Sequence, residues 1–116
     1  MPIHSRYLFS AAMDVAPEKE ALFHEVYDTE HVPLLGKVPG VIAVARFKLE
    51  PLTIMLGGQR QTLVAEGEPR YSAVYEIESP DVLLSAAWAK AGEEGRWAGQ
   101  VRPFTKNRRH TLRLKI

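Results

Sequence analysis

The chain has 116 residues, of which 46% are hydrophobic and 25% are charged, with a formal net charge of +1. This length and composition predict one globular domain over residues 1–116 and are not typical of a disordered chain. The small net charge provides no general attraction for nucleic acid or an anionic membrane, and no apolar run approaches the roughly 20 residues that cross a bilayer.

The first half of the chain predicts a strand, a helix and a second strand. Residues 5–13 are aromatic and apolar and indicate the first strand. Pro17 suits the start of a helix, where its missing N–H would have no partner, and apolar residues at i, i+3 and i+4 spacing extend the helix to about Val32. Pro33 lacks the donor to continue and is expected to end this helix. Residues 41–49 are rich in β-branched side chains and predict the second strand.

Residues 51–70 form a connection that is long for a compact domain. The pair Gly57-Gly58 lies between two short runs, and residues 53–56 are expected to pair with residues 61–65 as a hairpin. We expect this segment to be an arm that is more mobile than the core or packs on a partner subunit.

The second half of the chain predicts a strand, a helix and a final strand. Residues 71–78 alternate and indicate the third strand of a sheet. Ser79 as N-cap and Pro80 in the first turn predict a helix that runs to Lys90. Residues 107–116 alternate again, and their charged side chains are typical of a sheet edge.

The order β-α-β-β-α-β is that of the ferredoxin-like split βαβ unit, an α+β fold with an antiparallel sheet. Both crossover helices then cover the same face of the sheet and leave the other face bare. Residues 5–13 and 41–49 are mostly apolar on both faces, so the bare face needs cover. A second copy of the chain is the simplest cover. We therefore expect a homodimer in which two sheets pack face to face as a dimeric α+β barrel.

A helix end and the turn after it carry the most specific motif of the chain. The motif consists of Tyr27, Glu30, His31, Pro33 and Leu34, followed by Val38-Pro39-Gly40-Val41. Together with the βαββαβ order and residues 71–88, it resembles the EthD-like proteins of the dimeric α+β barrel superfamily. That superfamily includes polyketide cyclases, muconolactone-type isomerases, cofactor-independent monooxygenases and haem-degrading enzymes. The resemblance implies the fold, and it implies a catalytic role only for His31, which matches a helix-end histidine. The long segment 51–70 departs from the family pattern.

His31 is a candidate general base or acid, or a donor that orients a carbonyl group. The alternative is a structural histidine that interacts with the last carbonyl groups of its helix. Placement at a helix C-terminus raises the pKa of an imidazole and burial lowers it, so the sequence leaves the direction open. Glu30 either sets the tautomer of His31 or is a surface carboxylate, and neighbouring positions about 100° apart on a helix argue against a direct bond between the two.

Each of the other candidate residues has a structural role as the alternative to a role in ligand binding. Arg46 interrupts an apolar strand and either binds an anionic substrate or pairs with Glu76 across the sheet. Tyr75, with Tyr7 and His110, either lines a polar pocket or belongs to the core.

The two tryptophans differ in context. Trp88 lies on a predicted helix and is expected in the core, whereas Trp97 lies between glycines and is a candidate lid or dimer contact. The basic residues 106–109 lack interleaved aromatic residues and are expected to be a solvated strand entry rather than a nucleic-acid site.

Several kinds of site are not supported. The absence of cysteine excludes disulfides, thiolate catalysis and zinc sites with Cys ligands. The four histidines show no metal-ligand spacing, and no dinucleotide, phosphate-loop or Gly-x-Ser-x-Gly pattern occurs in a fitting context. We therefore expect no metal and no cofactor. The apolar run at residues 7–13 is interpreted as a strand rather than an export signal, so the cytoplasm is the expected location.

Two functional hypotheses follow. The first is a cofactor-free enzyme that isomerises, cyclises or dehydrates a small carbonyl or polyketide-like compound, with His31 moving a proton. In this hypothesis Tyr75 or Arg46 steadies negative charge on oxygen, and Tyr27 and Trp97 are further substrate contacts. The second hypothesis is a non-catalytic small-molecule-binding or assembly module with a structural histidine. A pocket that holds His31 beside tyrosine or arginine favours the enzyme, and an interior filled by aliphatic side chains favours the module.

Overall fold

The structure, a computed structural model, describes residues 6–116 and contains one four-stranded antiparallel sheet, one separate hairpin and three α-helices. The strands are β1 Tyr7–Val15, β2 Val41–Lys48, β3 Leu52–Leu56, β4 Gln59–Leu63, β5 Tyr71–Ile77 and β6 Thr105–Leu114, and the helices are α1 Glu20–Val26, α2 Val32–Gly36 and α3 Ala86–Glu93. The main sheet has the order β2-β5-β1-β6, and all its pairs are antiparallel. The predicted ferredoxin-like α+β fold is confirmed. His4 and Ser5 lie outside the described residues.

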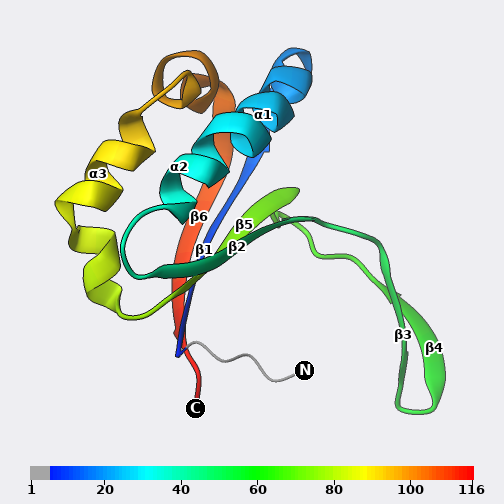
Figure 1. Ribbon diagram of the computed structural model, residues 1–116. Helices are drawn as coiled ribbons and strands as arrows, with labels where there is room; N and C mark the ends of the chain where they lie inside the picture. Colours follow the sequence, from blue (N-terminus) through cyan, green and yellow to red (C-terminus); the bar gives the residue numbers. More distant parts are fainter. Residues whose placement is uncertain (1–5) are drawn as a thin grey trace.

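All three helices lie on one side of the main sheet, and the hairpin β3–β4 projects from the opposite side (Figure 1). The strands keep the alternation predicted from the sequence, because every second side chain of β5 is buried under the helices. These inward residues are Tyr71, Ala73, Tyr75 and Ile77, and they pair with Met13, Ala11, Phe9 and Tyr7 of β1 on the same face. The core therefore lies between the helices and one face of the sheet.

Pro33 does not end the first helix as the sequence predicted. A π-helical turn, Tyr27–His31, joins α1 to α2, and the helix continues to Gly36. The Val32 N–H donates to the carbonyl of Tyr27, five residues earlier, so the helix widens just before the proline. Pro33 then occupies the first turn of α2, where a missing N–H is tolerated. The wider turn is the physical reason that the sequence pattern alone misjudged the boundary.

The second predicted helix is divided in two. Residues Pro80–Leu84 form a 3₁₀ turn, and α3 starts anew at Ala86. Ser85, not Ser79, is the N-cap, because its hydroxyl accepts a hydrogen bond of 3.1 Å from the backbone N–H of Trp88. Ser79 makes no such bond.

The predicted hairpin is confirmed, with its turn at Gly57-Gly58 and with strand bounds within two residues of those expected. Its greater mobility or its packing on a partner subunit stays a prediction. In the described part of the chain, no helix is long and apolar enough to cross a membrane. A cytoplasmic location stays a prediction.

Candidate functional site

His31 is the last residue of the π-helical turn, and its side chain points into the core with 6% of its surface exposed. A π turn changes the direction of the residues that it carries relative to a regular helix, and such turns are frequent at functional sites. The imidazole stacks on the indole of Trp97, with ring centroids 4.3 Å apart and planes inclined by 18°. Tyr27 contacts both rings edge-on, at 5.2 Å from His31 and 4.9 Å from Trp97.

Glu30 holds the loop that supplies Trp97. Its carboxylate accepts hydrogen bonds from the backbone N–H of Arg96 at 2.9 Å and from the guanidinium Nε at 2.6 Å. These bonds from Arg96 keep the pKa of Glu30 below its usual value. Gly95 has a φ of +73°, and a Cβ there would come within 2.5 Å of the Glu30 carboxylate. Glu30 therefore positions Arg96 rather than the imidazole of its neighbour.

A cavity of about 190 Å³ lies between the helices and the sheet, beside this aromatic cluster. Its wall is largely aromatic and carries a few polar groups. It is lined by Phe9, Ala11, Met13, Tyr27, His31, Leu35, Tyr75, Trp88, Ala89, Gly92, Glu93, Trp97, Arg102, Arg108 and His110. Four of the five residues that the sequence singled out thus meet at one cavity: His31, Tyr27, Tyr75 and Trp97.

The two tyrosines of the cavity form a hydroxyl pair. Tyr75 lies on β5 and Tyr27 on the π turn, and both are almost fully buried. Burial raises the pKa of both phenols, and each group also acts on the pKa of the other. Both groups are therefore protonated at neutral pH and act as neutral donors or acceptors.

Two arginines place positive charge at the cavity. Arg102 is held by Glu93 (Nη1 to Oε1, 3.0 Å) and by the carbonyl of Gly92 at 3.1 Å. Arg108 forms no ion pair with any residue in the range 6–116. Its charge is therefore available to a ligand.

An irregularity in β6 sets the position of Arg108. The pairing of β1 with β6 shifts between Ala12 and Asp14, where Asn107 has a φ of +52° and one residue of β6 is extra. A bulge of this kind redirects the side chains beside it and is common next to active sites. The Asn107 amide donates to the Asp14 carboxylate at 3.1 Å, which holds the bulge in place.

His31 is neutral at physiological pH. Burial lowers its pKa to about 4, and the charges of Arg102 and Arg108 act in the same direction, while Glu93 opposes them. The structure thus decides the direction that the sequence left open. Nδ1 of His31 is buried and has no hydrogen-bond partner among the described residues. A buried polar atom without a partner costs about 1–3 kcal/mol.

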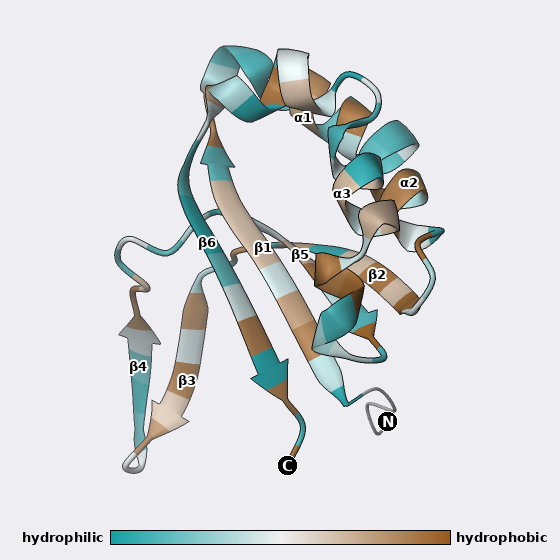
Figure 2. Cartoon of the chain, turned by 90° about the vertical axis from the view of Figure 1, so that its left-hand side faces the viewer, coloured by the Kyte–Doolittle hydropathy of each residue, from teal (hydrophilic) through white to brown (hydrophobic). Residues whose placement is uncertain are grey.

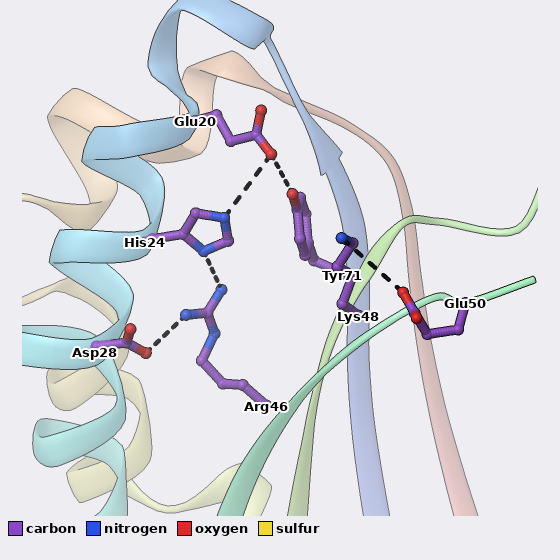
Figure 3. Close-up of polar contacts among 7 residues, drawn as sticks. All are labelled: Glu20, His24, Asp28, Arg46, Lys48, Glu50 and Tyr71. Atoms are coloured by element: carbon purple, nitrogen blue, oxygen red, sulfur yellow. Dashed lines mark hydrogen bonds and ion pairs between the residues drawn. The ribbon is translucent and has the colours of Figure 1, made fainter.

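Arg46 lies outside this cavity. It points from β2 toward α1, where Nη1 donates to Asp28 at 2.7 Å and Nη2 donates to Nδ1 of His24 at 2.9 Å (Figure 3). Because arginine can only donate, His24 accepts at Nδ1 and carries its proton at Nε2, which is 3.9 Å from Glu20. The hydroxyl of Tyr71 donates to the same carboxylate of Glu20.

The expected pairing of Arg46 with Glu76 is not found. The two residues lie on opposite faces of the sheet, since Arg46 is paired in register with Ala73 on the helix side and Glu76 with Ala43. The guanidinium of Arg46 instead lies 4.6 Å from the ring centre of Tyr27. Tyr27 lines the cavity and Arg46 does not, so the ring of Tyr27 separates Arg46 from the cavity.

Sequence reasoning missed Arg108 and Arg102. Residues 106–109 are exposed, as expected, but Arg108 also lines the cavity. The alternation of β6, extended by one step, would have indicated this, because Arg108 shares a face with His110. His110 and Trp88 both line the cavity. His110 is exposed and stacks on Phe9 at 5.9 Å, and Trp88 is partly buried and meets Phe9 edge-on at 5.7 Å. No sequence pattern indicated that Arg102 lies at the cavity, because the helical turns around it do not follow a regular period. Residues 6–116 contain no group of three or more side chains suited to a metal ion.

No family profile matches the chain, and no curated protein is significantly similar in sequence. Solved structures do match. An ethyl tert-butyl ether D (EthD) family protein from Bacillus halodurans C-125 superimposes with a TM-score of 0.58 and 13% identity, over 95% of this chain and 99% of that chain. The chain shares the EthD-like fold. MhuD, a haem degrader from Mycobacterium tuberculosis whose structure contains two haems in its active site, matches with a TM-score of 0.54 and 15% identity, over 95% of both chains. A variant of MhuD with two manganese protoporphyrin IX molecules per active site gives 0.55 and 15%, over 95% of this chain and 93% of that chain.

At these identities the likeness concerns the fold alone, and the predicted resemblance is confirmed at that level. The chemistry of this chain therefore depends on its own cavity residues.

Proposed function

We propose that the cavity binds a small, partly aromatic carbonyl compound and that His31 moves a proton on it without a cofactor. The observation that carries the proposal is the neutral imidazole of His31 at the wall of an aromatic cavity, with two arginines at the same wall. Of the two hypotheses from the sequence, this arrangement favours the enzyme, because His31 stands beside tyrosines and arginines rather than aliphatic side chains.

The aromatic walls suit a planar ligand. Trp97, Tyr27 and Phe9 offer ring faces and edges, and stacking of a planar ligand on such rings adds to the gain from burying apolar surface. A cavity of about 190 Å³ is smaller than the roughly 300–1,000 Å³ of sites for drug-sized molecules, so the ligand is small.

The charges of the cavity favour the oxygen end of such a compound. Arg108 has no ion-pair partner in the described chain, and the Tyr75 hydroxyl is a neutral donor. Removing a proton from the carbon next to a carbonyl leaves negative charge on oxygen, which Arg108 and Tyr75 would stabilise. The neutral imidazole of His31 is free to accept that proton and return it elsewhere on the same molecule, so the net reaction is an isomerisation. With a pKa of about 4, His31 is a weak base, and it depends on this stabilisation of the oxygen to react.

The EthD-like fold also occurs in MhuD, which binds haem, so this group was tested against the residues present. A histidine ligates haem iron through a ring nitrogen, and the imidazole of His31 is packed against Trp97, whose ring centre is 4.3 Å away. The cavity is also too small for a macrocycle without displacement of that indole. The residues do not fit haem, and no haem chemistry is proposed.

We infer further that the chain acts as a homodimer in which two sheets pack through their open faces. This face of the sheet carries a shallow apolar hollow of about 340 Å³. It is lined by Leu8, Ala43, Val44, Ala45, Phe47, Val74 and Glu76, and Phe47 is 56% exposed. A contiguous exposed apolar surface is typical of a protein–protein interface, which supports the proposal.

The experiment that tests the proposed chemistry uses 2-tetralone, a planar bicyclic ketone with acidic protons next to its carbonyl, and tetralin as the matched hydrocarbon. We expect the ketone to bind more tightly than the hydrocarbon, and its α-protons to exchange with D₂O faster in the presence of the protein, as measured by NMR. His31→Gln, which keeps a polar side chain but not the base, should abolish the acceleration.

Two outcomes decide between the hypotheses. Binding of 2-tetralone without any acceleration of exchange would support the non-catalytic binding module. Full acceleration in His31→Gln would remove His31 from the reaction.

A further inference from the structure

The hairpin β3–β4 has one apolar face and one polar face. Residues that pair directly in an antiparallel ladder point to the same side, and the register joins Leu52 to Leu63, Ile54 to Gln61 and Leu56 to Gln59. The apolar arm face therefore consists of Leu52, Ile54, Leu56 and Leu63, with the two glutamines. All four apolar side chains are 40–47% exposed. The other face carries Thr53, Met55, Arg60 and Thr62, and the hydroxyls of its two threonines are 3.1 Å apart.

Within residues 6–116, no other element of the chain covers the arm. β3 and β4 form a separate sheet that pairs with no other strand (Figure 2). The radius of gyration, 15.9 Å, exceeds the roughly 13 Å of a compact domain of this length, as expected of a projecting segment. An isolated two-stranded hairpin is only marginally stable in water, so the apolar arm face requires a partner surface.

The root of the arm is anchored, so its direction is defined. The carbonyl of Gly67 accepts hydrogen bonds from Asn107 at 2.8 Å and from Arg109 at 3.0 Å, both on β6. On the β5 side, the backbone N–H of Arg70 donates to Asp14 at 2.8 Å. These contacts hold the returning chain across the end of the main sheet.

The anchored arm lies on the open side of the main sheet, opposite the helices (Figure 1). Apolar side chains connect the two surfaces: Phe47 on the open face is followed by Leu49, which is 44% exposed, and Leu49 lines a hollow at the root of the arm with Leu52 and Leu63. Leu49 thus connects the open face to the apolar arm face along the chain.

We propose that the arm clasps a second copy of this chain that packs on the open face, with the apolar arm face against the partner subunit. Packed sheets lie about 10 Å apart, and five residues of strand span about 17 Å, so the arm is long enough to pass the interface and contact the partner. A two-fold axis applies the same contact twice and covers both arms and both sheets with one kind of partner. The net charge of +1 supplies no attraction for nucleic acid as an alternative occupant.

The clasp rests on the proposed sheet dimer, and the experiment separates the two. The dissociation constant of the dimer is measured by analytical ultracentrifugation for the natural chain, for Ile54→Lys on the apolar arm face and for Thr62→Lys on the polar face. We expect Ile54→Lys to weaken the dimer by about tenfold or more, because each dimer would bury two unpaired charges. Thr62→Lys adds the same charge to the same hairpin and should change the constant less than about twofold.

The outcomes are distinguishable. A natural chain that stays monomeric overturns both the clasp and the sheet dimer. A dimer whose constant is the same for Ile54→Lys and Thr62→Lys overturns the clasp alone and leaves the arm to another occupant.

Hydrogen exchange supplies a second measurement that does not depend on a variant. The amides of residues 52–63 should gain protection when the concentration is raised through the dissociation constant. An arm that exchanges equally fast in monomer and dimer contradicts the clasp. Binding of 2-tetralone to Ile54→Lys monitors the cavity independently, so a failure of the clasp does not count against the proposed chemistry.

Discussion

At the scale of single residues, two neighbours on one helix hold two neighbours on a distant loop. Glu30 binds Arg96, and His31 stacks on Trp97. The sequence left open whether Glu30 sets the tautomer of His31 or is a surface carboxylate, and the structure gives each of the two residues a separate partner. Their side chains diverge on the helix, and for that reason one can anchor the loop at the rim while the other meets the indole inside.

The depressed pKa of His31 makes stability depend on pH. The unfolded chain has an imidazole pKa near 6.5 and the folded chain one of about 4, so the unfolded state binds the proton first as the pH falls. The free energy of unfolding should therefore decrease by roughly 3 kcal/mol between pH 7 and pH 4 through this group. Urea unfolding over this range measures the decrease. In His31→Gln this part of the pH dependence should disappear; an unchanged slope would contradict the neutral, buried imidazole.

Loss of the Glu30 carboxylate should loosen Trp97. In a Trp88→Phe background, where Trp97 is the remaining fluorophore, Glu30→Gln removes the charge that holds Arg96 and should increase quenching of the indole by acrylamide. Glu25→Gln is the matched control, because Glu25 pairs with the same guanidinium at 2.9 Å but does not bind the backbone of the loop. Equal quenching in the two variants would mean that the loop is held by other contacts.

At the scale of elements, helix boundaries here depend on single hydrogen bonds. The π turn lets one helix pass Pro33, and the Ser85 cap starts α3 where the pattern of apolar residues predicted an unbroken helix. Both features position residues that line the cavity. The π turn carries His31, and the Ser85 cap is followed by Trp88.

Removing the Ser85 cap should cost about 1 kcal/mol of unfolding free energy, as is usual for an N-cap serine replaced by alanine. Urea unfolding of Ser85→Ala measures this loss. Ser79→Ala is the control, because the hydroxyl of Ser79 caps nothing, and its unfolding free energy should stay within a few tenths of a kcal/mol of the natural chain.

At the scale of the whole molecule, the two faces of the main sheet differ, because helices cover only one of them. The helices cover one face of the sheet, and the open face retains an apolar hollow with Phe47 at its edge. The fold of the monomer therefore leaves apolar area that association would remove from water.

Light scattering at micromolar concentration should give twice the mass of the chain. Phe47→Lys should shift the mass toward that of one chain, because it places a charge in the proposed sheet interface. Leu84→Lys is the control: Leu84 is even more exposed, at 84%, but lies on the helical side. A monomer already in the natural chain, or a dimer unaffected by Phe47→Lys, would exclude packing through the open faces.

The sequence by itself determined the order of elements and the faces of the strands. Alternation with a period of two places every second residue of β5, including Tyr71 and Tyr75, on one side of the sheet, whatever these residues contact. Gly57-Gly58 permits the hairpin turn. These properties are local, so a pattern of residue types is enough to predict them. The same holds for His31, Tyr27, Tyr75 and Trp97, because each stood out for its residue type in its place along the chain.

Only the tertiary structure decided which of these residues meet and in what state. Arg46 binds Asp28 on the π turn and His24 on α1 because its side chain lies on the helix side of β2, whereas the bulge at Asn107 brings Arg108 to the cavity from the far end of the chain. The lowered pKa of His31 likewise follows from its burial beside Trp97, which is 66 residues away in sequence. Desolvation and ion pairing depend on distances between segments that are remote in the chain, and no local pattern encodes those distances.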